Sequence, residues 1–439
     1  MEIAGKRVMV MGLGVSGLAA ARFLARRGAE LVLTDTRTDI NRGLLPHGEV
    51  HLGVDDPALG AIELIVVSPG IARDTRLLRA ADTGGIPVIG EMELASRFIR
   101  TPIIAITGTN GKSTVTMMIG AMLRAAGMRV FVGGNLGTPL IEAVDGAFDA
   151  IVVEASSFQL ETIVDFKPHV GVYLNLTDDH FERYRDRAEY GRAKARLFIN
   201  QGADDWAILN RDDSAVWELA STMRARVMSF GMESIAADRA IWNDGADLRF
   251  VRGGVCGRVA MDGFALAGRH NRVNAMAAAG AALAVGVDAR VIGAALADFR
   301  GLPHRIEFVR EKNGVVYIDD SKGTNVGAVM KALEAVAPPI ILLAGGVDKG
   351  GDYAPLRPLL STRAKLLVLY GAAREKMRAA LDGAITITVA NTLAEAVNIA
   401  AANARPGDTV MLSPACSSFD QFRDYAERGH IYQELVRAL

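Results

Sequence analysis

A glycine-rich segment near residue 110 has the composition of a loop that binds phosphate groups. It reads Gly108-Thr109-Asn110-Gly111-Lys112-Ser113-Thr114 and lies between an apolar run at 103–106 and a stretch with helical spacing. In such a loop backbone N–H groups surround the phosphates, the lysine reaches the β and γ phosphates, and the following hydroxyl can join a Mg²⁺ shell. Ile106 lies where the usual motif has its first glycine. The segment is therefore a variant phosphate-binding loop, and it predicts ATP or GTP as a ligand.

A second glycine-rich segment, Gly12-Leu13-Gly14-Val15-Ser16-Gly17, follows an apolar run at 7–11 and opens another stretch with helical spacing. Asp35 ends the next apolar run, where its carboxylate could accept a hydrogen bond from a ribose hydroxyl. This context fits a dinucleotide fingerprint and so a NAD-dependent oxidoreductase. Any nucleotide diphosphate would fit the same donors, and a plain glycine turn between a strand and a helix has the same sequence. The complete strand–turn–helix context favours diphosphate binding, with the kind of nucleotide left open.

Two polar segments follow apolar runs downstream of the phosphate-binding loop. Glu154 ends the run at 150–153, and His180 closes the segment 175–180 after the run at 170–174. Mg²⁺ prefers hard oxygen ligands, so a carboxylate at a strand end near a phosphate loop is a candidate ligand. Taken singly, a strand-end glutamate fits a solvated cap and a lone histidine fits the surface. A nucleotide-dependent switch without bond formation would explain the phosphate loop but would leave both residues without a role.

These segments lie at the ends of predicted strands. Short β-branched runs alternate with amphipathic helical stretches along the chain, a pattern typical of parallel sheets covered by helices. The predicted fold class is therefore α/β. A further strand series starts at Val315, and the other expected strands are 7–11, 30–34, 64–67, 87–89, 103–106, 129–132, 150–153, 170–174, 206–209, 340–343, 366–369, 385–389 and 409–412.

The same patterns divide the chain into three predicted domains. Residues 1–95 form a Rossmann-like unit, and residues 96–301 form a P-loop-type ATPase domain with a mostly parallel sheet. Between 239 and 266, short runs broken by Asn-Asp-Gly, Gly-Gly and Asp-Gly predict antiparallel hairpins added to that sheet. Glycine and proline in Gly301-Leu302-Pro303-His304 indicate a linker, after which residues 302–439 form a second Rossmann-like domain.

Composition limits the class of partner. The 439 residues carry 49 Lys and Arg against 50 Asp and Glu, which gives no net field to attract nucleic acid. The two cysteines, Cys256 and Cys416, are far apart in the sequence, and no Cys/His group has zinc-ligand spacing. No apolar stretch is long enough for a signal segment or a membrane span. We therefore expect a cytoplasmic protein without a nucleic acid or membrane partner.

Several motifs together resemble the Mur ligase family. Besides the 108–114 loop they are Glu154-Ala155-Ser156-Ser157-Phe158-Gln159-Leu160, the segment 175–180, Gly268-Arg269-His270-Asn271, Leu302-Pro303-His304-Arg305 and Asp320-Ser321-Lys322. The resemblance covers the whole chain. The tail at 413–422 is similar to that of the members that add D-glutamate, and an Asp-Asn-Pro-Arg box typical of another branch is absent. Folylpolyglutamate-type ligases share the phosphate loop but lack the Rossmann-like N-terminal unit.

The resemblance implies an ATP-dependent amide ligase of peptidoglycan precursor synthesis. It implies ATP and Mg²⁺, an acyl-phosphate intermediate, and the small-molecule substrates UDP-N-acetylmuramoyl-L-alanine and D-glutamate; we expect a monomer. The N-terminal unit would then bind the UDP part of the substrate rather than NAD. The residues implied for that substrate are Val15, Ser16, Asp35, Thr36, Arg37, Ser68, Gly70, Asn135 and Ser156.

The resemblance also implies roles for the other motif residues. Lys112, His180 and Lys194 match catalytic positions, and Ser113, Glu154, His180 and Lys194 match metal ligands, with Lys194 as a carbamate formed with CO₂. That carbamate requires a neutral amine, so Lys194 must be desolvated or close to another cation. Helical spacing alone would instead make Lys194 a solvated surface residue. The nucleotide positions are Gly108, Thr109, Asn110, Gly111, Lys112, Ser113, Thr114, Asn271, Arg305, Asp320 and Lys322.

The D-glutamate site is implied by the C-terminal motifs. Its matching residues are Thr324, Lys349, Ser418, Phe419 and Tyr425, where Lys349 would pair with a carboxylate. The run at 345–350 departs from some relatives in the position of its acid, so the role of Asp348 stays open.

Overall fold

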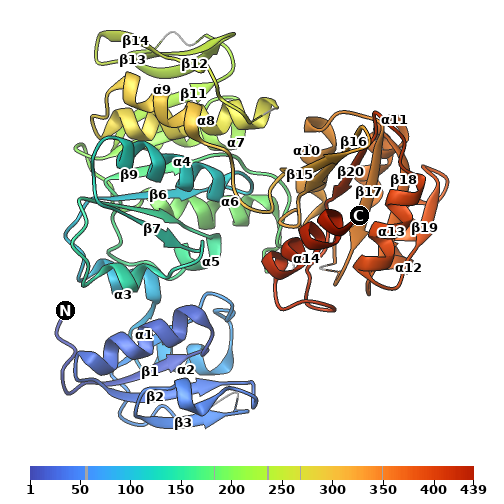
Figure 1. Ribbon diagram of the computed structural model, residues 1–439. Coiled ribbons are helices and arrows are strands. Elements are labelled where there is room, and N and C mark those ends of the chain that lie inside the picture. Colours follow the sequence, from blue (N-terminus) through green and yellow to red (C-terminus); the bar gives the residue numbers. More distant parts are fainter. Residues whose placement is uncertain (55–57, 182, 235–236, 267, 349) are drawn as a thin grey trace. The chain divides into compact units, whose positions relative to one another are not determined.

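The computed structural model is an α/β protein and describes residues 1–54, 58–181, 183–234, 237–266, 268–348 and 350–439. Contacts divide it into two compact units, residues 1–265 with 272–299 and residues 266–271 with 300–439. The first unit contains a five-stranded and a nine-stranded sheet, and the second contains a six-stranded sheet (Figure 1). The predicted α/β class with mostly parallel sheets is confirmed. Among the described residues, no helix combines the length and apolarity needed to cross a membrane.

The five-stranded sheet is parallel throughout, in the order β3-β2-β1-β4-β5. The turn after β1 requires glycine, because a Cβ on Gly17 would lie 1.8 Å from the carbonyl oxygen of Gly12. Strand β3 was not predicted, since its residues are only partly buried and lack an apolar run. The elements are β1 (Arg7–Met11), α1 (Val15–Arg26), β2 (Glu30–Asp35), η1 (Arg42–Leu44), β3 (Glu49–Leu52), β4 (Leu64–Val67), α2 (Arg76–Thr83), β5 (Val88–Gly90) and α3 (Glu91–Ser96).

The nine-stranded sheet has the order β14-β13-β12-β11-β10-β9-β6-β8-β7. It is parallel from β7 to β12 and antiparallel from β12 to β14, which confirms the predicted hairpins. The turn between β13 and β14 is Gly253-Gly254, both at positive φ, as a two-residue hairpin turn prefers. The strands are β6 (Ile103–Thr107), β7 (Val130–Gly134), β8 (Ala150–Glu154), β9 (Val170–Tyr173), β10 (Trp206–Asn210), β11 (Arg226–Gly231), β12 (Arg239–Asp244), β13 (Asp247–Arg252) and β14 (Val255–Val259).

The helices of this part follow the strands in the order expected for parallel connections. They are α4 (Lys112–Ala125), η2 (Leu140–Ala143), α5 (Ser157–Leu160), α6 (Arg187–Ala195), η3 (Arg196–Phe198), α7 (Ser214–Trp217), η4 (Glu218–Thr222), α8 (Arg269–Ala284) and α9 (Ala289–Asp298). The first residues of α8 belong to the second compact unit, and the rest belong to the first. The boundaries 1–95, 96–301 and 302–439 remain predictions.

The six-stranded sheet has the order β15-β16-β20-β17-β18-β19, with only the edge strand β15 antiparallel. Strand β15 was not predicted; it joins β16 through Asn313-Gly314, both at positive φ. The strands are β15 (Glu307–Lys312), β16 (Val315–Asp319), β17 (Ile340–Gly345), β18 (Ala364–Tyr370), β19 (Ile387–Val389) and β20 (Thr409–Leu412). The helices are α10 (Val326–Ala335), η5 (Ala354–Leu356), α11 (Arg357–Arg363), α12 (Arg374–Leu381), α13 (Leu393–Asn403) and α14 (Tyr425–Ala438).

A buried glutamate lies where α3 begins. Glu91 is 2% exposed and accepts one hydrogen bond, from the backbone N–H of Ile141 at 2.6 Å. Its second carboxylate oxygen has no partner among the described residues. Burial, with a smaller contribution from the charge of Glu142, raises the pKa of Glu91 to about 7. The folded state therefore favours the protonated carboxyl.

We predict that Glu91 makes the protein less stable as pH rises. Because its pKa is raised from an ordinary 4.5 to about 7, the stabilisation is complete below pH 4.5 and is lost as pH rises through 7. The loss amounts to about 1.4 kcal/mol per pH unit within that window. Glu91→Gln removes the titrating group, so its melting temperature should fall less than that of the wild type between pH 5 and pH 8. The exposed neighbour provides a control: Glu142→Gln should keep most of the wild-type pH dependence, and an equal loss of slope in both variants would contradict the assignment.

Candidate active site

The phosphate-binding loop starts two residues later than the usual pattern suggests. Ile106 lies inside β6, fully buried, and its carbonyl accepts the N–H of Ala155 at 2.8 Å. The chain leaves the sheet only after Thr107, where Gly108 has φ +147°. A Cβ on Gly108 would lie 2.9 Å from the Cβ of Leu174. An isoleucine at 106 is therefore compatible with the loop, because that residue is part of the strand.

The loop is attached to the segment that follows β9. The N–H of Thr109 donates to the Asn175 carbonyl at 2.9 Å, and the N–H of Asn110 donates to the Asn175 side-chain oxygen at 2.9 Å. The Asn175 amide in turn donates to the carbonyl of Asn110 at 3.0 Å. Gly111 has φ +88°, and a Cβ there would lie 2.4 Å from the side-chain oxygen of Asn274. Helix α4 begins at the next residue, so its N-terminal N–H groups and dipole face any anion in the loop.

Two lysine amines meet on one backbone carbonyl of this loop. Lys112 Nζ and Lys194 Nζ each donate to the carbonyl oxygen of Gly108 at 2.9 Å. Lys194 lies on α6, which begins after Asp186 because that side chain caps the N–H of Glu189. Lys194 is 1% exposed, and burial together with the charge of Lys112 holds its pKa well below the ordinary value. The expectation of a desolvated amine beside another cation is confirmed.

Glu154 lies at the end of β8, between Ser113 in the first turn of α4 and Asn135 just after β7. Its two oxygens accept hydrogen bonds from Ser113 Oγ at 2.6 Å and from Asn135 Nδ2 at 2.7 Å. Glu154 is 3% exposed and Ser113 is 6% exposed, so this carboxylate is not a solvated cap. Two hard oxygen donors beside the phosphate loop are the kind of ligands that Mg²⁺ uses.

His180 lies on the loop before α6 and is held in a strained conformation, with φ +58°. Its ring centroid is 4.9 Å from that of Phe158 and 5.8 Å from that of Tyr190. Tyr190 also lies under Lys194, whose Nζ is 4.3 Å from the ring centroid. The ring of Tyr190 therefore contacts both His180 and Lys194. The sequence analysis missed Tyr190, although its position four residues before Lys194 places the two on one helix face.

The residues predicted for the UDP part lie at the carboxyl ends of β1, β2 and β4. Asp35 accepts hydrogen bonds from the N–H of Leu13 at 2.7 Å and from the Arg37 guanidinium at 2.9 Å. Burial opposes ionisation of Asp35, but these two donors outweigh it and lower its pKa to about 2. Ser68 Oγ donates to the Gly12 carbonyl at 2.7 Å. Thr36 and Gly70 lie in these loops, and Val15 and Ser16 open α1, whereas Asn135 and Ser156 follow β7 and β8 of the other sheet.

The second unit contains the remaining predicted nucleotide residues, Asn271, Arg305, Asp320 and Lys322. Asp320 is 4% exposed and accepts Ser413 Oγ at 2.6 Å. Burial raises the pKa of Asp320 to about 7, although the Ser413 hydroxyl and the charge of Arg305 act in the opposite direction. Lys322 Nζ lies 5.2 Å from the ring centroid of Tyr425. That contact places one residue predicted to bind the nucleotide, Lys322, beside one predicted to bind D-glutamate, Tyr425.

The other predicted D-glutamate residues differ in exposure. Ser418 is 2% exposed and Phe419 is 71% exposed, while Thr324 is half-buried in the loop before α10. Lys349 falls outside the described residues. Asp348 accepts Tyr353 Oη at 2.7 Å and Lys376 Nζ at 2.6 Å, which ties it to neighbouring side chains of the same unit.

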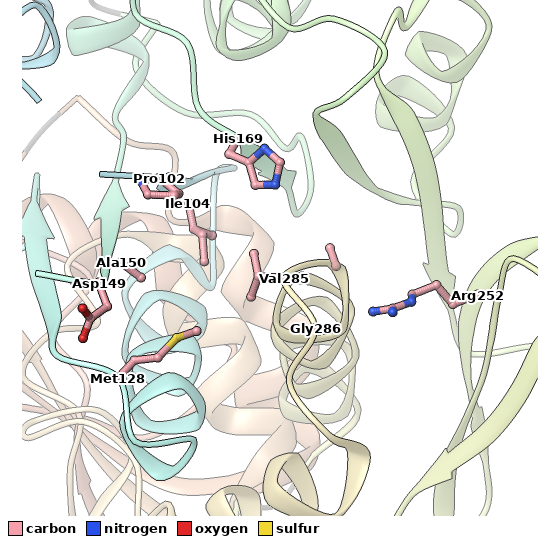
Figure 2. A pocket seen from close by; sticks show the side chains of 10 residues that line it. Pro102, Ile104, Met128, Asp149, Ala150, His169, Arg252, Val285 and Gly286 are labelled. Carbon is pink, nitrogen blue, oxygen red and sulfur yellow. The ribbon is translucent and has the colours of Figure 1, made fainter. Parts of the chain in front are cut away.

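A cavity of about 410 Å³ opens at the opposite edge of the nine-stranded sheet (Figure 2). Its polar lining groups already have partners: Asp149 pairs with Arg129, His169 lies 3.3 Å from Asp205, and Arg252 donates to a helix carbonyl. None of the predicted site residues that the structure describes lines it. The candidate active site is therefore the phosphate loop and the strand ends around it.

Three family models match successive parts of the chain. The Mur ligase MurD-like N-terminal domain matches residues 6–90, the Mur ligase middle domain matches 106–282, and the Mur ligase glutamate ligase domain matches 304–416. The first of these matches assigns the Gly12–Gly17 segment to a ligase domain rather than to a dehydrogenase.

Full-length relatives agree with these matches. The chain is 46% identical to a UDP-N-acetylmuramoylalanine--D-glutamate ligase of Geobacter metallireducens, covering 100% of this chain and 99% of the relative. It is 44% identical to the enzyme of that name from Desulfosudis oleivorans, covering 100% of this chain and 98% of the relative.

Solved structures share the fold at low identity. A pseudomurein peptide ligase type C from Methanothermus fervidus has a TM-score of 0.62 and 20% identity, covering 99% of this chain and 100% of its own. The UDP-N-acetylmuramate-alanine ligase MurC of Thermotoga maritima has a TM-score of 0.60 and 17% identity, covering 99% of each chain. The E. coli FolC protein has a TM-score of 0.60 and 18% identity, covering 79% of this chain and 92% of its own. With three family models along its length and relatives that are nearly half identical from end to end, this chain belongs to the Mur ligase family.

Proposed function

We propose that this protein is an ATP-dependent amide ligase that joins D-glutamate to UDP-N-acetylmuramoyl-L-alanine in peptidoglycan precursor synthesis. The relatives of that name support the substrates. The single structural observation that carries the chemistry is the group formed by the phosphate loop, Lys112, Ser113 and Glu154. It combines an anion-binding helix start with a cation and a carboxylate, which is what transfer of a terminal phosphoryl group needs. We further propose that the enzyme acts as a monomer in the cytoplasm.

The first step would be phosphorylation of the substrate carboxylate. A carboxylate oxygen attacks the γ-phosphorus of ATP, the bond to the β-γ bridging oxygen breaks, and ADP leaves. Two anions must approach each other in this step, so positive charge has to offset their repulsion. Lys112 would turn from the loop carbonyls toward the β and γ phosphates, and the N–H groups at the start of α4 would hold the same oxygens.

Mg²⁺ fits the oxygen atoms at this point. Ser113 Oγ and Glu154 Oε2 lie 2.6 Å apart, are buried, and lie at the carboxyl end of the sheet where the phosphates would bind. We propose these two residues as ligands of one ion, and His180 with carbamylated Lys194 as ligands of a second. When bound, Mg²⁺ would withdraw charge from the triphosphate and from the carboxylate under attack.

The environment of Lys194 supports the proposed carbamate. Its neutral Nζ can attack CO₂ and lose a proton, which forms a new N–C bond and replaces a potential cation by an anionic oxygen pair. Burial favours the neutral amine that this addition requires, and Lys112 at the shared Gly108 carbonyl provides a positive charge to balance the product.

The second step would be attack by the amine of D-glutamate on the acyl carbon. The tetrahedral intermediate then expels phosphate, and the nitrogen loses a proton to give the amide. We propose that Asn271, Arg305, Asp320 and Lys322 hold the nucleotide and that Thr324, Lys349, Ser418, Phe419 and Tyr425 bind D-glutamate. The UDP part would be held by the loops after β1, β2 and β4, where ionised Asp35 can accept a hydroxyl hydrogen bond.

We predict that phosphate release from ATP depends on both UDP-N-acetylmuramoyl-L-alanine and D-glutamate. Lys112→Ala should reduce this release by about a hundredfold or more, because a phosphate-stabilising charge is lost. Arg124→Ala changes an exposed cation near the other end of α4 and should retain activity. ATP hydrolysis that ignores both co-substrates, or a product mass without the added glutamyl group, would contradict the proposal.

Lys194→Ala should lower turnover by about a hundredfold or more and should be partly rescued by short-chain carboxylic acids, which supply the missing oxygen ligands. ¹³C-labelled bicarbonate should give a carbamate resonance in the wild type that is absent from the variant. Arg192→Ala, on the exposed face of the same helix, should keep both activity and resonance. A wild-type spectrum without a carbamate signal would exclude the modification.

A further inference from the structure

Two pairs of neighbouring residues meet at the end of β16. His304 precedes Arg305 in the loop before β15, and Asp319 precedes Asp320 where β16 ends. Arg305 and Asp320 belong to the proposed nucleotide set, and the charge of Arg305 acts to lower the pKa of Asp320. His304 and Asp319 have no role in that set, yet they are 3% and 0% exposed.

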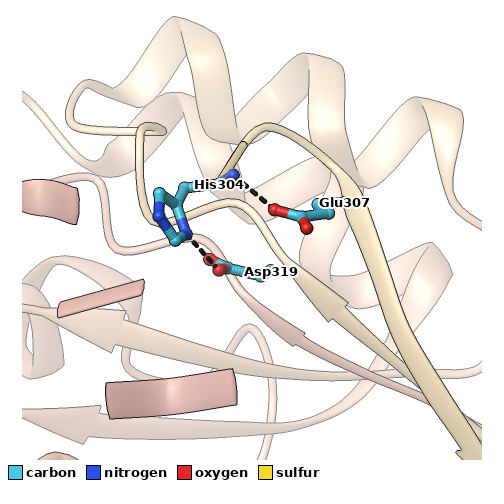
Figure 3. Close-up of side chains that lie close together, drawn as sticks. All are labelled: His304, Glu307 and Asp319. Carbon is cyan, nitrogen blue, oxygen red and sulfur yellow. Dashed lines mark hydrogen bonds and ion pairs between the residues drawn. The ribbon is translucent and has the colours of Figure 1, made fainter. Parts of the chain in front are cut away.

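The buried pair forms a short hydrogen bond inside a larger group (Figure 3). His304 Nδ1 lies 2.6 Å from an oxygen of Asp319, and the backbone N–H of His304 donates to Glu307 at 2.7 Å. Gln433 of α14 donates its amide to the same oxygens of Asp319 and Glu307, at 2.9 Å and 3.0 Å. Each carboxylate therefore accepts bonds from the protein itself.

This arrangement differs from that of a cation site, although three possible ligand atoms lie within 4.8 Å of one another. The amide of Gln433 donates to both carboxylates, so a donor group occupies the position between them. The geometry of this group is that of a hydrogen-bond network.

The network holds a strained stretch of backbone on both sides of Arg305. His304 has φ +61° and Ile306 has φ +47°, and a β-branched residue rarely adopts such a value. The N–H of Ile306 donates to Asp320 at 3.2 Å, and the carbonyl of His304 accepts the N–H of Lys322 at 3.0 Å. Strained conformations of this kind persist only where surrounding contacts fix them.

Helix α14 is shaped to receive the His304 ring. A Cβ on Gly429 would lie 2.2 Å from His304 Nδ1, so only glycine leaves room for the imidazole. The preceding Arg428 is fully buried and donates to the carbonyl of Ser321 at 2.8 Å. One face of α14 thus contacts both His304 and the Asp320-Ser321-Lys322 segment.

We propose that His304, Asp319 and Gln433 form a positioning network that fixes Arg305 and Asp320 for nucleotide binding, with His304 acting through its neighbours rather than on the nucleotide. This inference rests on the proposed ATP-dependent function. His304 keeps the turn at 304–306 in its left-handed form, and Asp319 and Gln433 both contact Nδ1 of its ring.

The test separates positioning from packing by means of a double variant. Two quantities are measured on the full chain. One is the affinity for a non-hydrolysable ATP analogue in the presence of Mg²⁺, determined by calorimetry. The other is the melting temperature without nucleotide. His304→Ala, Asp319→Asn and Gly429→Ala should each weaken analogue binding about tenfold, as expected for loss of a buried charged hydrogen bond or its displacement. In His304→Ala/Gly429→Ala the new methyl group occupies space left by the ring, so the melting temperature should recover while binding stays weak.

Tyr432→Phe is the matched control, because it removes a buried hydrogen bond from α14 to Val410 that is not part of the network. It should lower the melting temperature and leave analogue binding unchanged. Recovery of binding together with melting in the double variant would overturn the positioning role and leave a packing role. Stoichiometric Zn²⁺ or Mn²⁺ binding that Asp319→Asn abolishes would overturn it in favour of a metal site. A wild type that fails to bind the analogue would instead contradict the proposed function itself.

Discussion

The carbonyl oxygen of Gly108 accepts hydrogen bonds from two lysine amines, and the electrostatics of the first unit's site depend on that contact. Two ammonium groups this close, one of them fully buried, repel each other strongly in a poorly solvated interior. Burial and the charge of Lys112 both lower the pKa of Lys194, which favours an uncharged, nucleophilic amine near the phosphate loop. Lys112 remains the cation available to the phosphates.

The parallel topology explains why residues distant in sequence meet at this point. Ser113, Asn135, Glu154 and Asn175 follow four different strands, but the carboxyl ends of neighbouring parallel strands share one sheet edge. The sequence could predict this grouping because these strands are largely buried apolar runs. It could not predict β3 or β15 with the same ease, since partly exposed strands lack such a run. Strand β11 was missed although most of it is buried, because Ser229 and Gly231 interrupt its apolar residues.

Burial of single polar residues was the harder part of the prediction. The sequence of helix α6 is typical of a surface helix, because most of its residues are charged or small. The spacing of its apolar residues does not indicate that Lys194 faces inward. The partners that bury it, Gly108 and the ring of Tyr190, are fixed by tertiary structure. The burial of Asp319 could not be predicted from the sequence either. Its neighbour Asp320 belongs to a recognisable motif, but Asp319 is explained only by its contacts with His304 and with Gln433 of α14.

The glycine that admits the His304 ring has a consequence for how such sequences can change over time. Glycine inside a helix costs about 1 kcal/mol relative to alanine, so drift would ordinarily replace it with a better helix former. At position 429 that replacement collides with the imidazole, and loss of the imidazole in turn leaves a void beside the helix. Each residue therefore restricts the evolutionary substitutions open to the other, although 125 positions of chain separate them.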